Sequence, residues 1–413
     1  MSQQHTFHQI ALDNGLTIVG ERNPQARTFA AGYFVRTGSR DETAPVSGVS
    51  HFLEHMMFKG SDRRSAEDIN REFDELGANY NAFTSEERTV YYGAVLASFQ
   101  DRLLDLLTDM MRPALRESDF DMEKNVILEE IAMYQDHPQF RVFDLAAPRF
   151  FRGHPLGNSV LGSVESIKGL SRDAMMDYFV RRYAADNLTL VVAGNFDWDA
   201  LVAQVTGLSR SWSSSGAGRE HPALEPAGGM EFVTDSKLNR VHLAFHAPGV
   251  SAQSELRRAA SLLASCLGDA SGSRLFWALV DRGIADSASF SLDAGDGSGT
   301  FAGYASTEPD RAEQVRDVFL EVVRGIQDEL PSAAEWRAAQ TKAATGLTLG
   351  GETPFGRLIS LGSAWSYRRE YRTVREEVEA IMNTSLDDAA GFLADRPFDR
   401  LFTLQLGPDA GQS

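Results

Sequence analysis

The most informative stretch of this sequence is SGVSHFLEHMMF, residues 47–58. Its apolar run contains no proline, and no glycine after Gly48, which favours a helix. On a helix, His51 and His55 lie one turn apart on the same face, so their imidazoles converge on one point. A zinc ion needs this geometry from two of its protein ligands. Glu54 lies beside that point, where it can take a proton from bound water.

A zinc site built on two histidines needs a third donor, which is commonly a carboxylate. The helix predicted for residues 118–134 supplies Glu123, Glu129 and Glu130. Glu123 and Glu130 are seven residues apart and share a face, whereas Glu129 is turned away by about 100°. We therefore predict Glu130 as the third ligand and Glu123 as a carboxylate that hydrogen-bonds a ligand histidine. The alternative for each acidic residue is a solvated helix face, which we prefer for Glu129.

Length and composition indicate a globular protein of two domains. The chain has 413 residues, of which 43% are apolar and 24% charged, so disorder is not expected. The formal charge of −18 argues against a nucleic-acid binder, which needs a basic surface. This charge indicates solubility or, alternatively, an acidic chamber that attracts basic peptides.

The sequence predicts a cytoplasmic protein. A lone Cys266 excludes an intramolecular disulfide and fits a reducing compartment. Residues 1–15 do not resemble a secretory or mitochondrial targeting segment. The chain has no run of about 18 apolar residues, so we expect no membrane span.

The order of the predicted elements suggests a duplicated α+β unit. A hairpin around Asn14-Gly15 begins the first series. Strands at 29–35, 89–95 and 188–194 follow, with helices at 65–76, 98–111, 118–134, 172–183 and 197–208. Residues 209–229 are rich in Ser, Gly and Pro and are the predicted linker. The order then begins again, with strands at 231–234, 241–246, 301–306 and 401–406 and helices at 254–267, 274–280, 310–330, 333–349 and 385–394. We expect a zinc-binding domain over 1–208 and a second domain without metal over 230–413.

His51 to His55, followed by Glu130 in the segment EKNVILEE, resembles the inverted-zinc-motif peptidases of the pitrilysin, insulysin and mitochondrial processing peptidase family. Further similar pieces are GANYNAFT at 77–84, TVYY at 89–92, and the segment 268–276 that ends in SRLF. The resemblance covers nearly the whole chain. The chain's length resembles the short-chain subfamily, in which two chains pair as a clamshell to enclose a chamber.

The family resemblance implies a zinc-dependent endopeptidase with two similar α/β sandwich halves, each an antiparallel-rich sheet packed with helices. His51, His55 and Glu130 would hold Zn²⁺, and Glu54 would activate the attacking water. The family also offers its peptide substrate an edge strand, which maps onto Asn81 and Ala82. Backbone pairing of this kind suits extended or unfolded peptides.

One departure from the family pattern concerns an Arg and a Tyr seven residues apart, which help active members bind substrate and stabilise the oxyanion. Leu279 and Asp286 occupy the matching places here. The sequence therefore predicts a heterodimer in which a related subunit supplies the Arg–Tyr pair, with a homodimer as the alternative. The rival function is a catalytically idle scaffold or assembly subunit of the same fold.

His242 and His246 are also four residues apart, but they lie in a predicted strand. Such residues are about 13 Å apart along a strand and cannot share a metal ion. We interpret these two histidines as structural.

Overall fold

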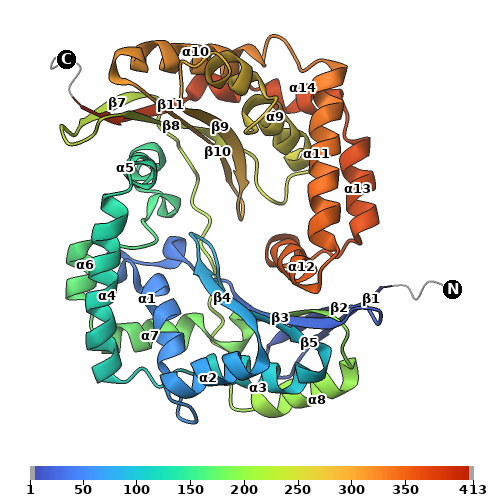
Figure 1. Cartoon of the computed structure of the whole chain (residues 1–413). Helices are drawn as coiled ribbons and strands as arrows, with labels where there is room; N and C mark the ends of the chain where they lie inside the picture. Colours follow the sequence, from blue (N-terminus) through green and yellow to red (C-terminus); the bar gives the residue numbers. More distant parts are fainter. Residues whose placement is uncertain (1–4, 409–413) are drawn as a thin grey trace. The chain divides into compact units, whose positions relative to one another are not determined.

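The computed structural model describes residues 5–408, which form two compact units (Figure 1). The first unit holds the described residues through 132, together with 158–220 and 348–374. The second unit holds residues 133–157, 221–347 and the described residues from 375 onward. Each unit therefore contains one segment from the opposite half of the chain. The contiguous ranges 1–208 and 230–413 stay a prediction for the domains, and the compact units differ from them by these exchanged segments.

The first unit is built on a six-stranded sheet with the order β1-β2-β6-β3-β5-β4. All its neighbouring strands are antiparallel except β2 and β6. The strands are β1 (Thr6–Ala11), β2 (Thr17–Arg22), β3 (Thr28–Val35), β4 (Asn79–Thr84), β5 (Thr89–Leu96) and β6 (Leu188–Gly194). The predicted hairpin at Asn14-Gly15 is confirmed as the β1–β2 pair.

The second unit repeats this arrangement in a five-stranded sheet with the order β7-β11-β8-β10-β9. Its only parallel pair is β7 with β11, at the position that β2 and β6 occupy in the first sheet. The strands are β7 (Gly229–Thr234), β8 (Val241–Gly249), β9 (Ser287–Ala294), β10 (Gly299–Thr307) and β11 (Phe402–Gly407). The shared strand order confirms the predicted duplication of one α/β unit.

Helices cover both faces of the first sheet, because successive residues of a strand point to opposite faces. Tyr33 of β3 points to one face, where its hydroxyl contacts Thr108 Oγ1 of α3 at 2.8 Å. Phe34 points to the other face and packs against α12. The helices of this unit include α2 (Ala66–Leu76), α3 (Gln100–Met110), α6 (Val164–Gly169), α7 (Arg172–Arg182), α8 (Trp198–Leu208) and α12 (Pro354–Arg368).

The exchange of segments follows from two helices, α5 and α12, whose apolar faces pack against the sheet formed by the opposite half of the chain. Leu358, Leu361 and Trp365 of α12 are buried with strand residues of the first sheet. In the second unit, α5 (Pro138–Phe151) buries Val142 and Phe150 against the second sheet. Burying such side chains is worth about 1.5–3 kcal/mol each, so both helices contribute to holding the two halves of the chain together.

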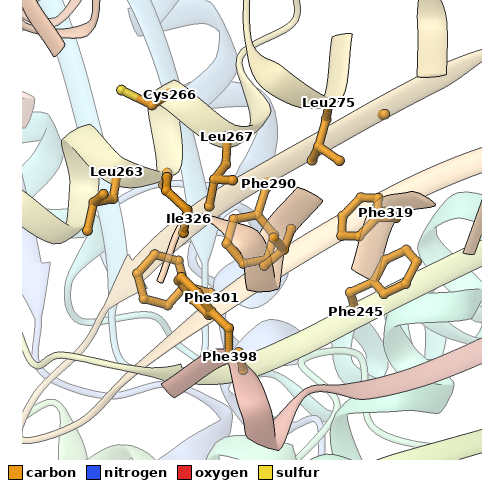
Figure 2. Packing of buried hydrophobic residues seen from close by; sticks show 14 of the residues in the cluster. Phe245, Leu263, Cys266, Leu267, Leu275, Phe290, Phe301, Phe319, Ile326 and Phe398 are labelled. Atoms are coloured by element: carbon orange, nitrogen blue, oxygen red, sulfur yellow. The ribbon is translucent and has the colours of Figure 1, made fainter. Parts of the chain in front are cut away.

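The core of the second unit is rich in stacked phenylalanines (Figure 2). Phe245 of β8 stacks on Phe319 of α10, with ring centroids 3.7 Å apart. The lone Cys266 lies at the edge of this core, where burial raises the pKa of its thiol to about 12. The other helices of this unit are α9 (Arg257–Gly268), α10 (Ala312–Gly325), α11 (Ala333–Gly351), α13 (Val374–Asn383) and α14 (Leu386–Leu393), of which α11 and α13 extend into the first unit's segment 348–374.

The first part of the predicted linker is fastened to the first unit. Asn14 Nδ2 donates to the carbonyl of Ser209 at 2.8 Å, and Ser214 Oγ donates to the carbonyl of Asn14 at 2.7 Å. Arg182 Nη1 donates to the carbonyl of Gly218 at 2.9 Å. Residues 209–220 therefore behave as part of this unit, although their composition is that of a linker. No helix among residues 5–408 combines the length and apolar character needed to cross a bilayer.

Gly362 of α12 gives a test of this packing. A Cβ atom at Gly362 would lie 2.0 Å from Cζ of the buried Phe34, so we expect Gly362→Ala to destabilise the protein by about 1–3 kcal/mol through overpacking. The matched control is Gly207→Ala in α8. The added Cβ would have no neighbouring atom within 4 Å there, so alanine should stabilise the protein by about 0.4–1 kcal/mol. Thermal and denaturant unfolding measure both changes. Equal stability of Gly362→Ala and the unsubstituted protein would contradict the close approach of α12.

Candidate metal centre and catalytic site

The helix α1 (Val49–Met56) begins at Gly48, whose backbone has a left-handed φ of 89°. A side chain is excluded there, because a Cβ would lie 2.7 Å from the carbonyl oxygen of Leu161. The buried carboxylate of Glu42 accepts the backbone N–H groups of Gly48 at 2.6 Å and Ser50 at 2.7 Å. A carboxylate at a helix N-terminus satisfies free N–H groups and favours the helix dipole. Sequence reasoning missed this role of Glu42.

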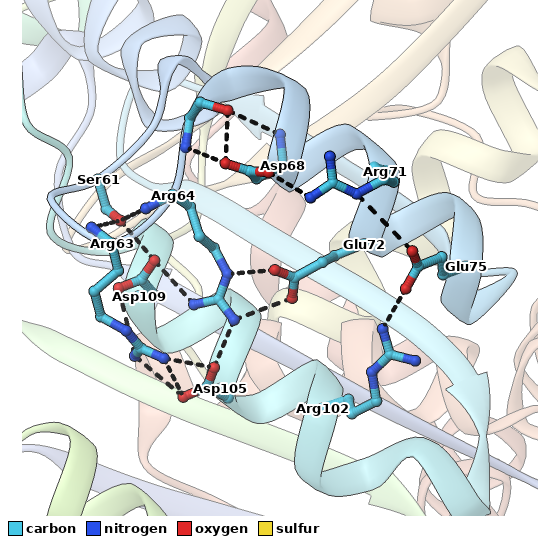
Figure 3. Close-up of polar contacts among 11 residues, drawn as sticks. Ser61, Arg63, Arg64, Asp68, Arg71, Glu72, Glu75, Arg102, Asp105 and Asp109 are labelled. Atoms are coloured by element: carbon cyan, nitrogen blue, oxygen red, sulfur yellow. Dashed lines mark hydrogen bonds and ion pairs between the residues drawn. The ribbon is translucent and has the colours of Figure 1, made fainter.

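The opposite end of α1 is fixed through the loop that follows it (Figure 3). Arg64 pairs with Glu72 of α2 at 2.8 Å and with Asp105 of α3 at 2.6 Å. Ser61 Oγ donates to Asp109 of α3 at 2.6 Å. These contacts join the loop to two helices, so both ends of α1 are held in place.

His51 and His55 project from one face of α1, and Glu130 reaches them from α4 (Glu117–Gln135). Glu130 Oε2 lies 3.7 Å from His51 Nε2 and 3.4 Å from His55 Nε2. One ligand atom from each of the three residues lies within 4.8 Å of the others. The structure thus brings together the three residues predicted as metal ligands, and their role as ligands stays a prediction.

The protonation of His51 and the orientation of His55 suit a divalent cation such as zinc. Burial, and then the charge of His55, lower the pKa of His51 to about 3, so this imidazole is neutral. His55 Nδ1 hydrogen-bonds Glu123 Oε1 at 2.8 Å, which orients the ring and leaves Nε2 directed at Glu130. Two imidazole nitrogens and one carboxylate oxygen form a donor set that zinc accepts, with a fourth position left for water.

Glu123 also lies where the helical spacing predicted it, on the face of α4 that carries Glu130. Its second oxygen, Oε2, pairs with Lys59 Nζ at 2.5 Å, and the carboxylate is almost completely buried. Burial alone would raise the pKa of Glu123, but the hydrogen bonds with His55 and Lys59 lower it. For His55, burial lowers the pKa, while the bond to Glu123 and the charge of Glu130 raise it above the ordinary value. Lys59 was not predicted, although it follows His55 at a spacing of four.

Glu54 lies on α1 next to His55 and has a second fixed contact. Thr84 Oγ1 of β4 donates to Glu54 Oε2 at 2.6 Å. Burial, supported by the negative charge of Glu130, raises the pKa of Glu54, while Thr84 and His55 oppose this change. A carboxylate with a raised pKa is a stronger base than one in water, and it suits proton transfer near neutral pH. Thr84 was not singled out by sequence reasoning.

Asn81 and Ala82 lie in β4, the last strand of the first sheet. Ala82 is opposite Tyr91 of β5, and the other side of β4 has no strand partner within the described residues. The Ala82 N–H donates to Asn81 Oδ1 at 2.9 Å. Thr84 belongs to the same strand, so this free edge begins next to Glu54. The alternation of Tyr80 and Ala82 with two asparagines fits a strand.

The remaining residues singled out in the sequence lie in the second unit. Leu279 is completely buried in the core, and Asp286 pairs with Arg240 at 3.5 Å. Neither provides a cation or a phenol. His242 and His246 lie in β8, as predicted for a strand: His242 Nδ1 contacts the Tyr304 hydroxyl at 2.8 Å, and His246 is buried against aromatic rings.

Two family models match the chain. The model described as Insulinase (Peptidase family M16) matches residues 17–164, and the model described as Peptidase M16 inactive domain matches residues 169–343. An uncharacterized zinc protease of Mycobacterium leprae is 33% identical over 409 residues, covering 97% of this chain and 92% of that protein. The uncharacterized zinc protease YmxG of Bacillus subtilis is 31% identical over 403 residues, covering 96% and 97%.

Solved structures share the fold at low sequence identity. A protease from Helicobacter pylori has a TM-score of 0.91 at 18% identity and covers 98% of this chain and 100% of its own. A peptidase M16 inactive domain from Pseudomonas fluorescens has a TM-score of 0.89 at 18% identity and covers 99% of both chains. A chain of complex III from Candida albicans has a TM-score of 0.83 at 17% identity and covers 97% and 95%. Together with the relatives above, which are more than 30% identical over nearly their whole length, the family models show that this chain belongs to the insulinase family, peptidase family M16.

Proposed function

We propose that this protein is a zinc-dependent endopeptidase that hydrolyses extended or unfolded peptides. The observation that carries the proposal is the convergence of His51, His55 and Glu130 beside the Glu54 carboxylate. The names of the relatives from M. leprae and B. subtilis, both zinc proteases, support it. A cytoplasmic location stays a prediction.

In this proposal His51 and His55 hold the cation through Nε2, and Glu130 holds it through a carboxylate oxygen. Zinc, when bound, supplies a Lewis acid that polarises the peptide carbonyl and lowers the pKa of water. Glu54 accepts the proton of the attacking water and passes it to the leaving amine. Thr84 keeps the Glu54 carboxylate in place during both transfers, because its hydroxyl donates to Oε2.

The free edge of β4 is the proposed binding surface for the peptide backbone. An extended peptide adds to such an edge through main-chain hydrogen bonds, which require little side-chain identity. Asn81 must then release the Ala82 N–H, because this donor is the one that an added strand would use. The proposed edge leads the peptide toward Glu54, since Thr84 of the same strand contacts that carboxylate.

We further propose that the active form is a heterodimer with a closed chamber. Leu279 is buried and Asp286 carries a negative charge, so neither can bind a developing oxyanion. A related subunit would supply the Arg–Tyr pair, and a homodimer is the alternative. The rival function, an idle scaffold, is favoured by the missing pair and by the likeness in fold to a chain of complex III. The intact set of metal donors favours the enzyme.

Zinc affinity tests the role of Glu123. We expect Glu123→Gln to lower the affinity by about 10–100-fold, because the amide holds the ring of His55 less firmly and makes it a poorer donor. Competition with a chelator of known affinity measures this change. The matched control is Glu129→Gln on the exposed side of the same helix, which should bind zinc like the unsubstituted protein. An unchanged affinity of Glu123→Gln would contradict the assignment.

Substitution of Glu54 tests the proposed chemistry. Glu54→Gln should lower kcat/KM for an unfolded peptide by about 100–10,000-fold, because no base then accepts the proton. Zinc content should stay at that of the unsubstituted protein, since Glu54 is not a ligand. If Glu54→Gln keeps full activity, or if the unsubstituted protein binds no zinc, the enzyme proposal fails and the scaffold takes its place.

Mixing with candidate partners tests the heterodimer. The purified chain alone should be weakly active, and a related chain carrying the Arg–Tyr pair should raise kcat by about 100-fold or more, as expected for restored oxyanion donors. A partner with both residues replaced serves as the control. Full activity from a preparation that contains only this chain would contradict the heterodimer.

A further inference from the structure

Arg219 is a buried arginine in a segment whose composition is that of a linker. Its side chain is 2% exposed, although its neighbours Gly218 and Glu220 are exposed. The guanidinium binds the Asp41 carboxylate with two hydrogen bonds, from Nε to Oδ1 at 3.0 Å and from Nη2 to Oδ2 at 2.7 Å. Taking a charge out of water is unfavourable, so a segment that only connects two units would leave this side chain in solvent. The burial of Arg219 therefore points to a further role.

The same guanidinium also holds the turn between β4 and β5. Its Nη2 atom donates to the backbone carbonyl of Glu87 in this turn. The Glu87 side chain forms a buried ion pair with Arg40, the residue that directly precedes Asp41. Arg219 thus joins the segment around Asp41 to the β4–β5 turn.

Each of these two segments leads to a group of the proposed catalytic site. Asp41 is followed by Glu42, whose carboxylate accepts N–H groups at the start of α1, the helix that carries Glu54. The turn follows Thr84, whose hydroxyl donates to the Glu54 carboxylate at 2.6 Å. The backbone of Glu54 therefore depends on one segment, and its carboxylate depends on the other. A shift between the two segments would turn this carboxylate away from its place beside the metal donors.

Arg182 of α7 binds Asp41 as well. Its Nη2 atom pairs with Asp41 Oδ1 at 2.7 Å, and its Nη1 atom donates to the carbonyl of Gly218 at 2.9 Å. The backbone next to Arg219 is therefore fixed independently of the Arg219 side chain. If Arg219 is replaced, Asp41 keeps a cationic partner, so the expected loss is one of geometry and not that of an unpaired buried charge.

We propose that Arg219 is a positioning residue, which fixes the Glu54 carboxylate relative to the metal donors by joining these two segments. This inference rests on the proposed function, because it gives Arg219 a part in proton transfer by Glu54. A planar guanidinium can bind a carboxylate with two bonds and a carbonyl at the same time, which the single ammonium group of a lysine cannot reproduce. The chain passes into the second unit at His221, so Arg219 lies close to the point where that unit is attached.

Hydrogen exchange in the metal-free full chain tests this positioning directly. The variant is Arg219→Ala, with Arg219→Lys as the conservative change. Arg357→Ala is the matched control, because Arg357 is also buried, binds the carboxylate of Glu21 with two hydrogen bonds and donates to one backbone carbonyl. Neither of these partners belongs to the two segments. Mass spectrometry gives the exchange rates of residues 39–50 and 80–90, and steady-state kinetics of the zinc-loaded protein with an unfolded peptide give kcat and KM.

We expect Arg219→Ala to raise the exchange rate at the start of α1 and in the β4–β5 turn by about tenfold or more, because local opening becomes easier there. Its kcat should fall by about 100-fold, as a misplacement of about 1 Å predicts, while zinc content and KM stay close to those of the unsubstituted protein. Arg219→Lys should restore part of both losses. Arg357→Ala should change neither kcat nor the exchange of these segments.

Three results would overturn the inference: unchanged exchange in both segments, raised exchange with unchanged kcat, or an equal loss of kcat in Arg219→Ala and Arg357→Ala. The last result would indicate a general loss of stability. Circular dichroism verifies that the variants are folded, and if Arg219→Ala is not, Arg219→Lys gives the same comparison with smaller changes. If Arg219→Ala loosens both segments in a chain that cleaves no peptide even with zinc, only the peptidase proposal fails.

Discussion

The site depends on one contact between two helices, the hydrogen bond from His55 Nδ1 on α1 to Glu123 Oε1 on α4. This contact fixes the ring of His55, and the same face of α4 then brings Glu130 toward both histidines. Burial alone would raise the pKa of Glu123, and its contacts with His55 and Lys59 lower the pKa and so stabilise the charged carboxylate. The geometry at Glu130 therefore follows from the way in which α4 is attached to α1.

Polar groups hold both ends of α1, the helix that carries His51 and His55. Burial raises the pKa of Glu42 to about 7, although the N–H groups of Ser50 and Gly48 oppose the change. The buried Glu42 carboxyl thus holds the start of the helix, although its burial is unfavourable. Ion pairs of Arg64 hold the loop at the end of the helix. An α1 held at both ends keeps its two histidines in position before a cation binds, and such preorganisation is what a metal site requires.

Much of the fold and of the site could be predicted from local spacing. The interval of four between His51 and His55, and the interval of seven between Glu123 and Glu130, place these side chains correctly because helical geometry is local. Apolar runs in the sequence also predicted six of the strands, β3, β5, β6, β8, β10 and β11. Element order alone was enough to suggest the repeated unit, which the two sheets share.

Other features depend on contacts between distant segments, and the sequence could not predict them. The strands β4 and β9 are polar edge strands, whose conformation comes from the neighbouring strand. The family resemblance implied the edge strand at Asn81 and Ala82, but the residue pattern alone predicted neither β4 nor β9. The helices α12 and α13 were not predicted. The helix α12 packs on the first sheet, although the last strand of that sheet ends at Gly194, far earlier in the chain. The contact of Thr84 with Glu54 follows from the pairing of β4 with β5. Spacing indicated the proposed metal donors, but the tertiary fold decides what surrounds them.

The most direct test of the central claim is a crystal structure of the zinc-loaded protein with anomalous data collected on both sides of the zinc absorption edge. We predict one strong zinc peak, with His51 Nε2 and His55 Nε2 at about 2.0–2.1 Å and a Glu130 oxygen at about 2.0–2.2 Å. Glu123 should remain on His55 Nδ1, and Glu54 should lie beside the ion without binding it. A zinc peak held by other residues, or no peak between α1 and α4 at saturating zinc, would contradict this account.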